Sequence, residues 1–258
     1  MSYFDSHAHL TIDATEQSER LARAKAAGVT HILNICTSLE SLERGLALSQ
    51  HDPDIYLAAA TTPHDVKVLG EKEFSLIAAH AKAGVLAAIG ETGLDYHYQH
   101  SPRDLQQLFL RRYLQLALEC QLPVIIHCRE AFSDLFKILD EAYCLGSQVP
   151  SGVLHCFTGS LEEAHELVRR GWFLSLSGIV TFKKSLDLHE VARWVPLENL
   201  LIETDSPFLA PQSKRGKPNE PSYLPEIAAF IASLKGISVK EVARATFNNA
   251  RQLFCNPL

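Results

Sequence analysis

The 258-residue sequence has no Cys-x-x-Cys pair, and its six cysteines are scattered along the chain. A zinc ribbon needs such pairs, so we expect reduced thiols, as in cytoplasmic proteins. Apolar runs are also short, because none approaches the roughly 18 residues that a membrane-spanning helix needs. The N-terminus lacks the basic start and apolar run of a signal peptide. These absences predict a cytoplasmic protein without a membrane partner.

Several common motifs are missing as well. The chain has no Gly-x-x-x-x-Gly-Lys loop, no Gly-x-Gly-x-x-Gly fingerprint and no Gly-x-Ser-x-Gly elbow, which argues against nucleotide hydrolysis, dinucleotide redox chemistry and serine hydrolysis. Positive charge is scarce, since 24 Lys and Arg against 30 Asp and Glu give a net charge of −6. Non-specific affinity for long nucleic acid comes from neutralising phosphates with Lys and Arg, so wrapping of a duplex is disfavoured. A small nucleic-acid site that takes its positive charge from bound metal stays open.

What the chain does have is a regular alternation of β-rich runs and helical patterns. The clearest helix lies in SPRDLQQLFLRRYLQLALEC, where we expect Ser101 as the N-cap and Pro102 as the first helical residue. Its apolar residues recur with the 3.6-residue period of a core-facing helix. Eight strands with helices between them predict a parallel sheet covered by helices. The expected strands are Tyr3–His9, Thr30–Cys36, Ile55–Ala60, Val85–Glu91, Val124–Cys128, Gly152–Cys156, Trp172–Ser177 and Leu200–Asp205.

Side chains able to bind metal lie at or near the C-terminal ends of five of these strands. In an α/β barrel all these ends share one face, and the first and last strands are neighbours. An open eight-stranded sheet would hardly bring five such ends together. About 250 residues is also a typical length for the barrel, and no linker or change of composition divides the chain. We therefore predict a single-domain (β/α)8 TIM barrel over residues 1–258.

His7 and His9 are two residues apart in the first expected strand. Side chains with this spacing point to the same face of a strand, so both can hold one ion. Asp5 shares that face and could orient a histidine from behind. Two histidines that fall two apart by chance are the alternative, and only the other strand ends decide between the two interpretations.

The other polar strand ends supply the remaining candidates. Glu91 lies between two glycines at the close of an apolar strand, where a carboxylate is costly to bury unless it is paired or metal-bound. His127 and His155 are the first polar residues after buried runs, and Asp205 leaves the last strand with Glu203 on the same face. For each residue alone, a solvated acid or a hydrogen-bonded core histidine is an alternative. Chance explains one such strand end but hardly five. Six ligands exceed the needs of one tetrahedral ion, so we expect two adjacent metals.

These motifs resemble the TatD family of metal-dependent deoxyribonucleases, within the amidohydrolase-like barrel hydrolases. The resemblance covers essentially the whole chain. The matching stretches are FDSHAHL, GETGLDY, PVIIHCREA, HCFTGS, ETDSPFLAP, RGKPNEPSYLP and NNARQLF.

The resemblance implies a two-metal site bridged by Glu91. One ion would be held by His7, His9, Glu91 and Asp205, and the other by Glu91, His127 and His155. Asp205 would also accept a proton from the attacking water, which makes Asp205 and Glu91 the expected catalytic residues. Arg129 and Arg215 would contact substrate phosphate, with a solvated or salt-bridged loop cation as the alternative for each.

The implied activity is hydrolysis of phosphodiesters, most simply as a 3′-5′ exonuclease on a DNA end or single strand. An ester or amide hydrolase, such as a D-aminoacyl-tRNA deacylase, is a second hypothesis. A non-catalytic metal-binding protein is a third, disfavoured because every ligand position is filled. Four histidines and two carboxylates favour zinc, manganese or nickel on affinity, and the resemblance allows magnesium. We expect a monomer.

The chain departs from the family pattern at Thr11, where similar proteins often carry Asp shortly after His-x-His-Leu, and more seriously at the end of the third expected strand. A Gly-x-His-Pro stretch commonly ends the third strand in similar proteins, and here the residues are Ala60-Thr61-Thr62-Pro63. Thr62 stands where the histidine is expected, and we expect His64, just after the proline, to be an exposed loop residue. The departure leaves the substrate class more open than metal binding.

Overall fold

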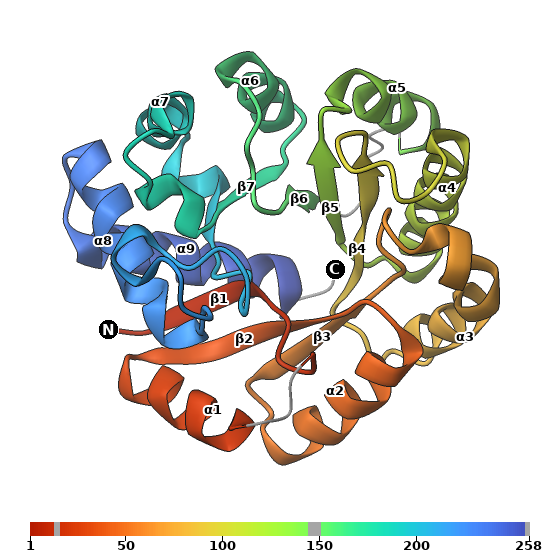
Figure 1. Cartoon of the computed structure of the whole chain (residues 1–258), viewed down its shortest axis with the longest axis horizontal. Helices are drawn as coiled ribbons and strands as arrows, with labels where there is room; N and C mark the ends of the chain where they lie inside the picture. The colour runs from red at the N-terminus through yellow and green to blue at the C-terminus, as the bar shows by residue number, and fades with distance from the viewer. Residues whose placement is uncertain (13–15, 144–150, 256–258) are drawn as a thin grey trace.

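The computed structural model describes residues 1–12, 16–143 and 151–255. Its strands form one parallel sheet in which each strand pairs with the next along the chain, and a ring of helices surrounds the sheet (Figure 1). The strands are β1 (Tyr3–Ala8), β2 (Val29–Cys36), β3 (Ile55–Ala59), β4 (Ala88–Asp95), β5 (Val124–Arg129), β6 (Gly152–Leu154), β7 (Phe173–Leu176) and β8 (Leu200–Ile202).

Contacts between the first and last strands complete the barrel. Ala8 pairs with Ser206 in a parallel bridge just beyond β8. The backbone N–H of Asp205 donates to the carbonyl of His7 at 2.9 Å, and that of His9 donates to Ser206 at 2.8 Å. The predicted (β/α)8 TIM barrel is therefore confirmed.

Helices connect the strands and cover the outside of the sheet. Three of them begin with a serine whose side chain accepts from the third helical N–H in a capping box, namely Ser38, Ser160 and Ser238. The helices are α1 (Gln17–Ala26), α2 (Leu39–His51), α3 (Glu71–Lys82), α4 (Arg103–Cys120), α5 (Phe132–Ala142), α6 (Leu161–Arg169), α7 (Leu186–Trp194), α8 (Leu224–Lys235) and α9 (Val239–Phe254). A π-helical turn (Val66–Gly70) precedes α3, and short 3-10 turns span Gly178–Thr181, Leu197–Asn199, Gln212–Lys214 and Pro221–Tyr223. Within the described residues, no helix combines the length and the apolar character needed to cross a bilayer.

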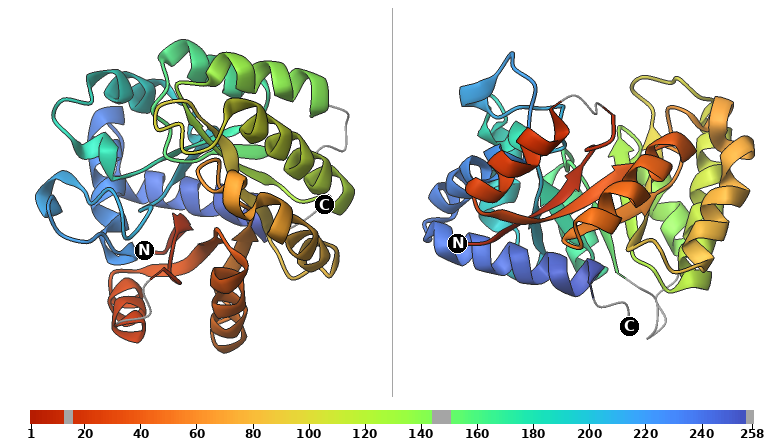
Figure 2. Two further views of the ribbon diagram at one scale, coloured as in Figure 1. Left: turned by 45° about the vertical axis from the view of Figure 1, so that its right-hand side comes forward. Right: turned by 90° about the horizontal axis from the view of Figure 1, so that it is seen from below.

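The barrel interior is a separate hydrophobic cluster to which every strand contributes, for example Phe4 from β1, Ile125 from β5 and Leu201 from β8. Leu253 and Phe254 at the end of α9 belong to the same cluster. Helix α9 thus lies across the end of the barrel where the strands begin (Figure 2). The opposite end, where the strands finish, is left for polar side chains.

The structure corrects several expected boundaries. Helix α4 has Pro102 as its N-cap, and the Ser101 hydroxyl instead donates to the carbonyl of His64 at 2.8 Å. Strand β4 does not end at Glu91 but continues to Asp95. Strands β6 and β8 end before His155 and Glu203, and Nδ1 of His155 lies 3.4 Å from Oε1 of Glu203.

Candidate metal centre

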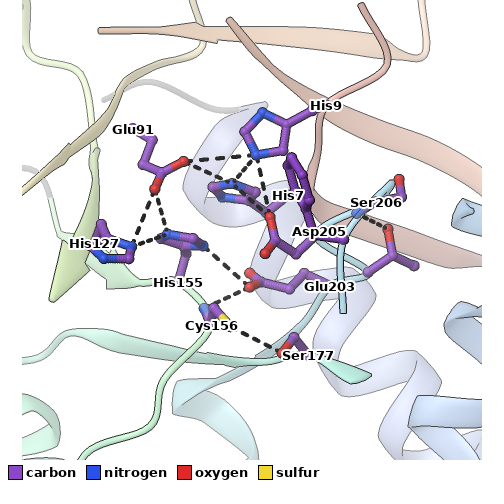
Figure 3. Close-up of polar contacts among 12 residues, drawn as sticks. His7, His9, Glu91, His127, His155, Cys156, Ser177, Glu203, Asp205 and Ser206 are labelled. Atoms are coloured by element: carbon purple, nitrogen blue, oxygen red, sulfur yellow. Dashed lines mark hydrogen bonds and ion pairs between the residues drawn. The ribbon is translucent and has the colours of Figure 1, made fainter. Parts of the chain in front are cut away.

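The structure brings the six predicted ligands together at the C-terminal end of the barrel (Figure 3). Their side chains are almost completely buried, and His127 is the most accessible at 20%. The predicted ligands are His7, His9, Glu91, His127, His155 and Asp205.

Four ligand atoms form a first cluster. The Nε2 atoms of His7 and His9 are 3.3 Å apart. Oδ1 of Asp205 lies 3.6 Å from the first and 3.3 Å from the second. Oε2 of Glu91 lies 3.5 Å from His7 Nε2 and 3.8 Å from His9 Nε2. Adjacent ligand atoms around a tetrahedral ion with bonds of about 2.0–2.1 Å are about 3.3 Å apart, so this cluster fits one metal ion.

A second cluster lies on the other side of the same carboxylate. Oε1 of Glu91 is 3.0 Å from Nε2 of His155 and 3.3 Å from Nδ1 of His127. These two nitrogen atoms are 3.3 Å apart. The three atoms could form one face of a coordination sphere, and Glu91 presents a different oxygen to each cluster.

Two glycines let Glu91 reach this position. Gly90 and Gly93 have φ angles of 154° and 147°, which L side chains rarely adopt. A Cβ atom on Gly93 would lie 1.9 Å from the carbonyl oxygen of His127, and one on Gly90 would lie 2.5 Å from Cβ of Ile125. The register of β4 against β5 shifts in the same segment. The close approach of the two strands therefore places Glu91 beside His127.

Asp95 and His64 lie behind the second cluster, and the sequence analysis assigned neither of them to the site. Oδ2 of Asp95 is 2.9 Å from Nε2 of His127 and 3.6 Å from Nε2 of His64. His64 is half-buried, so its expected place as an exposed loop residue is wrong. Thr62, where the family histidine is expected, instead donates from its hydroxyl to Asp65 at 2.9 Å. Strand periodicity could have identified Asp95, because residues 91, 93 and 95 share one face.

Asp5 does not orient a histidine, contrary to our expectation. Its side chain is fully buried, and Oδ2 accepts a 2.6 Å hydrogen bond from the hydroxyl of Thr204. Oδ1 accepts from the backbone N–H groups of Thr204 and His7. In the described part of the chain Asp5 touches no imidazole ring, and it ties β1 to the segment that follows β8.

The cluster needs positive charge. Burial alone would raise the pKa of Glu91, but His155, His127 and His7 outweigh burial and hold this pKa well below its usual range. Burial would lower the pKa of His155, whereas Glu91 and Glu203 raise it well above its usual value. Three buried carboxylates, those of Glu91, Glu203 and Asp205, thus face the histidines. Either protons or metal ions must compensate their charge, and the donor set suits metal ions.

The two predicted phosphate-binding arginines lie at different places. The guanidinium of Arg129, next but one to His127, lies over the ring of Tyr98 with Cζ 4.8 Å from its centroid. Arg215 is exposed and lies over Phe182, with Cζ 5.1 Å from its centroid. Neither arginine forms an ion pair within the residues that the structure describes, so both charges are available to a ligand.

Known proteins are similar to this chain in sequence and in fold. A model of the family described as TatD related DNase matches residues 4–255. The chain is 41% identical over 256 residues to a Bacillus subtilis (strain 168) protein named uncharacterized metal-dependent hydrolase YabD, and the match covers 97% of this chain and 98% of that protein. It is 36% identical over 258 residues to the 3′-5′ ssDNA/RNA exonuclease TatD of Citrobacter rodentium (strain ICC168), covering 97% of each. The crystal structure of YJJV, a TatD homolog from Escherichia coli K12, matches with a TM-score of 0.88 and 29% identity, covering 99% of this chain and 98% of that one. The chain therefore belongs to the TatD related DNase family of metal-dependent hydrolases.

Proposed function

We propose that this protein is a 3′-5′ exonuclease that uses two divalent cations to hydrolyse phosphodiesters of single-stranded DNA. The proposal rests on the two carboxylate oxygens of Glu91, which face different clusters. Oε2 faces His7 and His9, and Oε1 faces His127 and His155. The relative named 3′-5′ ssDNA/RNA exonuclease TatD supports the choice of bond and substrate. Zinc, manganese, nickel and magnesium are the candidate ions.

The residues present suit such a pair of ions. His7, His9, Glu91 and Asp205 would hold one, and Glu91, His127 and His155 would hold the other. Two bound cations supply Lewis acidity, which acidifies a water molecule and offsets the negative charge that grows on phosphoryl oxygens.

Asp205 is the residue that we assign as proton acceptor. Its side chain is 10% exposed, and its carboxylate lies 3.3 Å from Nε2 of His9 in the first cluster. Its backbone N–H donates to the carbonyl of His7, which fixes it against β1. A carboxylate held there can take a proton from an attacking water without moving the histidines. Arg129, without a carboxylate partner in the described part of the chain, would hold a substrate phosphate.

The test is cleavage of a 5′-labelled single-stranded oligonucleotide by protein reconstituted with each candidate metal. We expect a ladder that shortens from the 3′ end, and no ladder with Asp205→Asn. Asp134→Asn is the matched control, because this carboxylate on α5 binds Tyr96 and Gln107 outside the cluster. Intact DNA with every metal, from protein that binds two ions, would reject the nuclease. An ester or amide hydrolase, such as a D-aminoacyl-tRNA deacylase, would then become the leading alternative.

A further inference from the structure

Two aromatic side chains stand out by their exposure. Of the Phe, Tyr and Trp residues that the structure describes, only Tyr98 and Phe208 are exposed, at 53% and 49%. All the others are buried or half-buried. Both exposed rings border the candidate metal centre.

Phe208 lies beside the first cluster. It follows β8, and its ring meets the ring of His9 edge-on, with centroids 5.7 Å apart and an interplanar angle of 74°. Its backbone N–H donates to the carbonyl of Asp205 at 2.9 Å, and its carbonyl accepts from Asn219 at 2.7 Å. The backbone N–H and carbonyl of Phe208 are thus both hydrogen-bonded, while the residue stays exposed.

Tyr98 lies beside the second cluster. Its backbone N–H donates to Oδ1 of Asp95 at 2.8 Å, and Oδ2 of the same carboxylate contacts His127. Its ring is parallel to that of His100, with centroids 5.6 Å apart, and meets His64 edge-on at 5.9 Å. Arg129 brings a cation without a carboxylate partner among the described residues to the same ring. The exposed ring of Tyr98 and the guanidinium of Arg129 therefore lie together at this side of the site.

The two rings lie on opposite sides of the barrel mouth. Tyr98 belongs to the β4–β5 side and Phe208 to the β8–β1 side, which are half a turn apart in an eight-stranded barrel ordered β1 to β8. A ligand that passes over the ligand cluster from one side to the other meets one ring at each end.

We propose that Tyr98 and Phe208 are base-stacking subsites for the nucleotides on either side of the scissile phosphodiester, with Arg129 holding the adjoining phosphate. The proposal rests on the proposed nuclease function and adds how the substrate is held. Aromatic rings stack on every base, so these subsites tolerate any sequence but require bases with free faces. A base inside a duplex has both faces covered by its neighbours, so the two subsites select single strands or frayed ends.

The test is equilibrium binding of a fluorescein-labelled single-stranded oligonucleotide by anisotropy, in metal-loaded protein carrying Asp205→Asn to prevent cleavage. Adding Tyr98→Ala or Phe208→Ala should raise Kd by roughly 5- to 100-fold, as base–aromatic stacking does elsewhere. Tyr98→Phe and Phe208→Trp should keep Kd within about twofold. Leu108→Ala is the matched control, since Leu108 is 48% exposed but lies on the outer helix α4.

Abasic substrates separate stacking from a general loss of binding. An oligonucleotide that lacks the base at the 3′-terminal or the penultimate position should bind the parent protein with a higher Kd. For each abasic strand, one of the two alanine substitutions, the one at the ring that stacks on the missing base, should raise Kd no further. Unchanged Kd values in both alanine variants, or equal losses with intact and abasic strands, would overturn the proposal. DNA that binds and responds to the aromatic variants without being cut by the protein with Asp205 intact would reject the exonuclease but keep the subsites. Protein that binds no DNA would reject both.

Discussion

The Nε2 atom of His127 lies 2.9 Å from Oδ2 of Asp95. An ionised carboxylate only accepts hydrogen bonds, so Nε2 of His127 donates to Asp95, while Nδ1 is the nitrogen that faces Glu91 and the second cluster. Burial alone would raise the pKa of Asp95, but its bonds to His127 and to the backbone of Tyr98 lower it to about 2. Asp95 is therefore charged at neutral pH and fixes the tautomer that a metal-binding histidine needs.

Removing this carboxylate should weaken one metal site and spare the other. We expect Asp95→Ala to lower the affinity for the ion at His127 and His155 by about 10- to 100-fold, the usual effect of losing such a partner. The ion at His7 and His9 should keep its affinity. Calorimetric titration with Mn²⁺ or Zn²⁺ measures the metal affinities of both sites, and Asp134→Ala is the control variant. Two unchanged affinities would show that Asp95 does not hold His127 in place.

The Glu91→Ala and Asp205→Ala variants should differ in the number of metal ions that each protein retains. Glu91→Ala removes a ligand from both clusters, so the metal content after dialysis against a divalent metal should fall from two ions to fewer than one. Asp205→Ala removes a ligand from the first cluster alone and should leave about one ion. Mass spectrometric metal analysis of the folded variants gives the counts. A Glu91→Ala protein that keeps two ions would contradict the bridging role.

Gly93 should be far more sensitive to substitution than an open glycine. Its added Cβ would lie 1.9 Å from the backbone oxygen of His127, so β4 and β5 would have to separate. We expect Gly93→Ala to lower the free energy of unfolding by at least about 3 kcal/mol. Gly84 is the control, because it also has positive φ (+73°) but no atom within 4 Å of the added Cβ. Gly84→Ala should lower the free energy of unfolding by only about 1–2 kcal/mol. Urea denaturation of both variants measures the two free energies of unfolding. Equal losses of stability would show that the close approach of β4 to β5 does not make Gly93 special.

The same segment shows where sequence reasoning works and where it stops. Alternating apolar runs predicted all eight strands, and their ends predicted the ligands that meet in the barrel mouth. The end of the fourth strand was predicted at Glu91, the acid between two glycines that closes an apolar run. In the structure the strand continues to Asp95, because Gly90 and Gly93 permit a close approach of β4 to β5. A contact between two strands cannot be predicted from the residues of one strand alone.

His64 was left out of the site for a related reason. His64 is separated from the third strand by Pro63, and a histidine after a proline is typical of an exposed loop. Its ring is turned inward because the Ser101 hydroxyl donates to its carbonyl and Asp95 faces its Nε2. Both partners are more than 30 residues away along the chain, and tertiary contacts of this kind cannot be predicted from local pattern.

Metal ions should stabilise the folded chain. The buried carboxylates of Glu91, Glu203 and Asp205 each face a histidine of the centre, and ions bound only by the folded state shift the equilibrium toward it. At 100 times its Kd, each ion should add about 2.7 kcal/mol to the free energy of unfolding. Urea titrations with added metal and with a chelator measure the difference. The Glu91→Ala variant should show almost none, and a wild-type protein equally stable in chelator would argue against both ions.

In the proposed centre one carboxylate, that of Glu91, joins two metal ions. Anomalous diffraction from crystals equilibrated with Mn²⁺ tests it most directly. The account predicts two peaks about 3.5–4 Å apart, one beside Oε2 of Glu91 with His7 and His9, the other beside Oε1 with His127 and His155. A single peak, or two peaks that do not share Glu91, would contradict it.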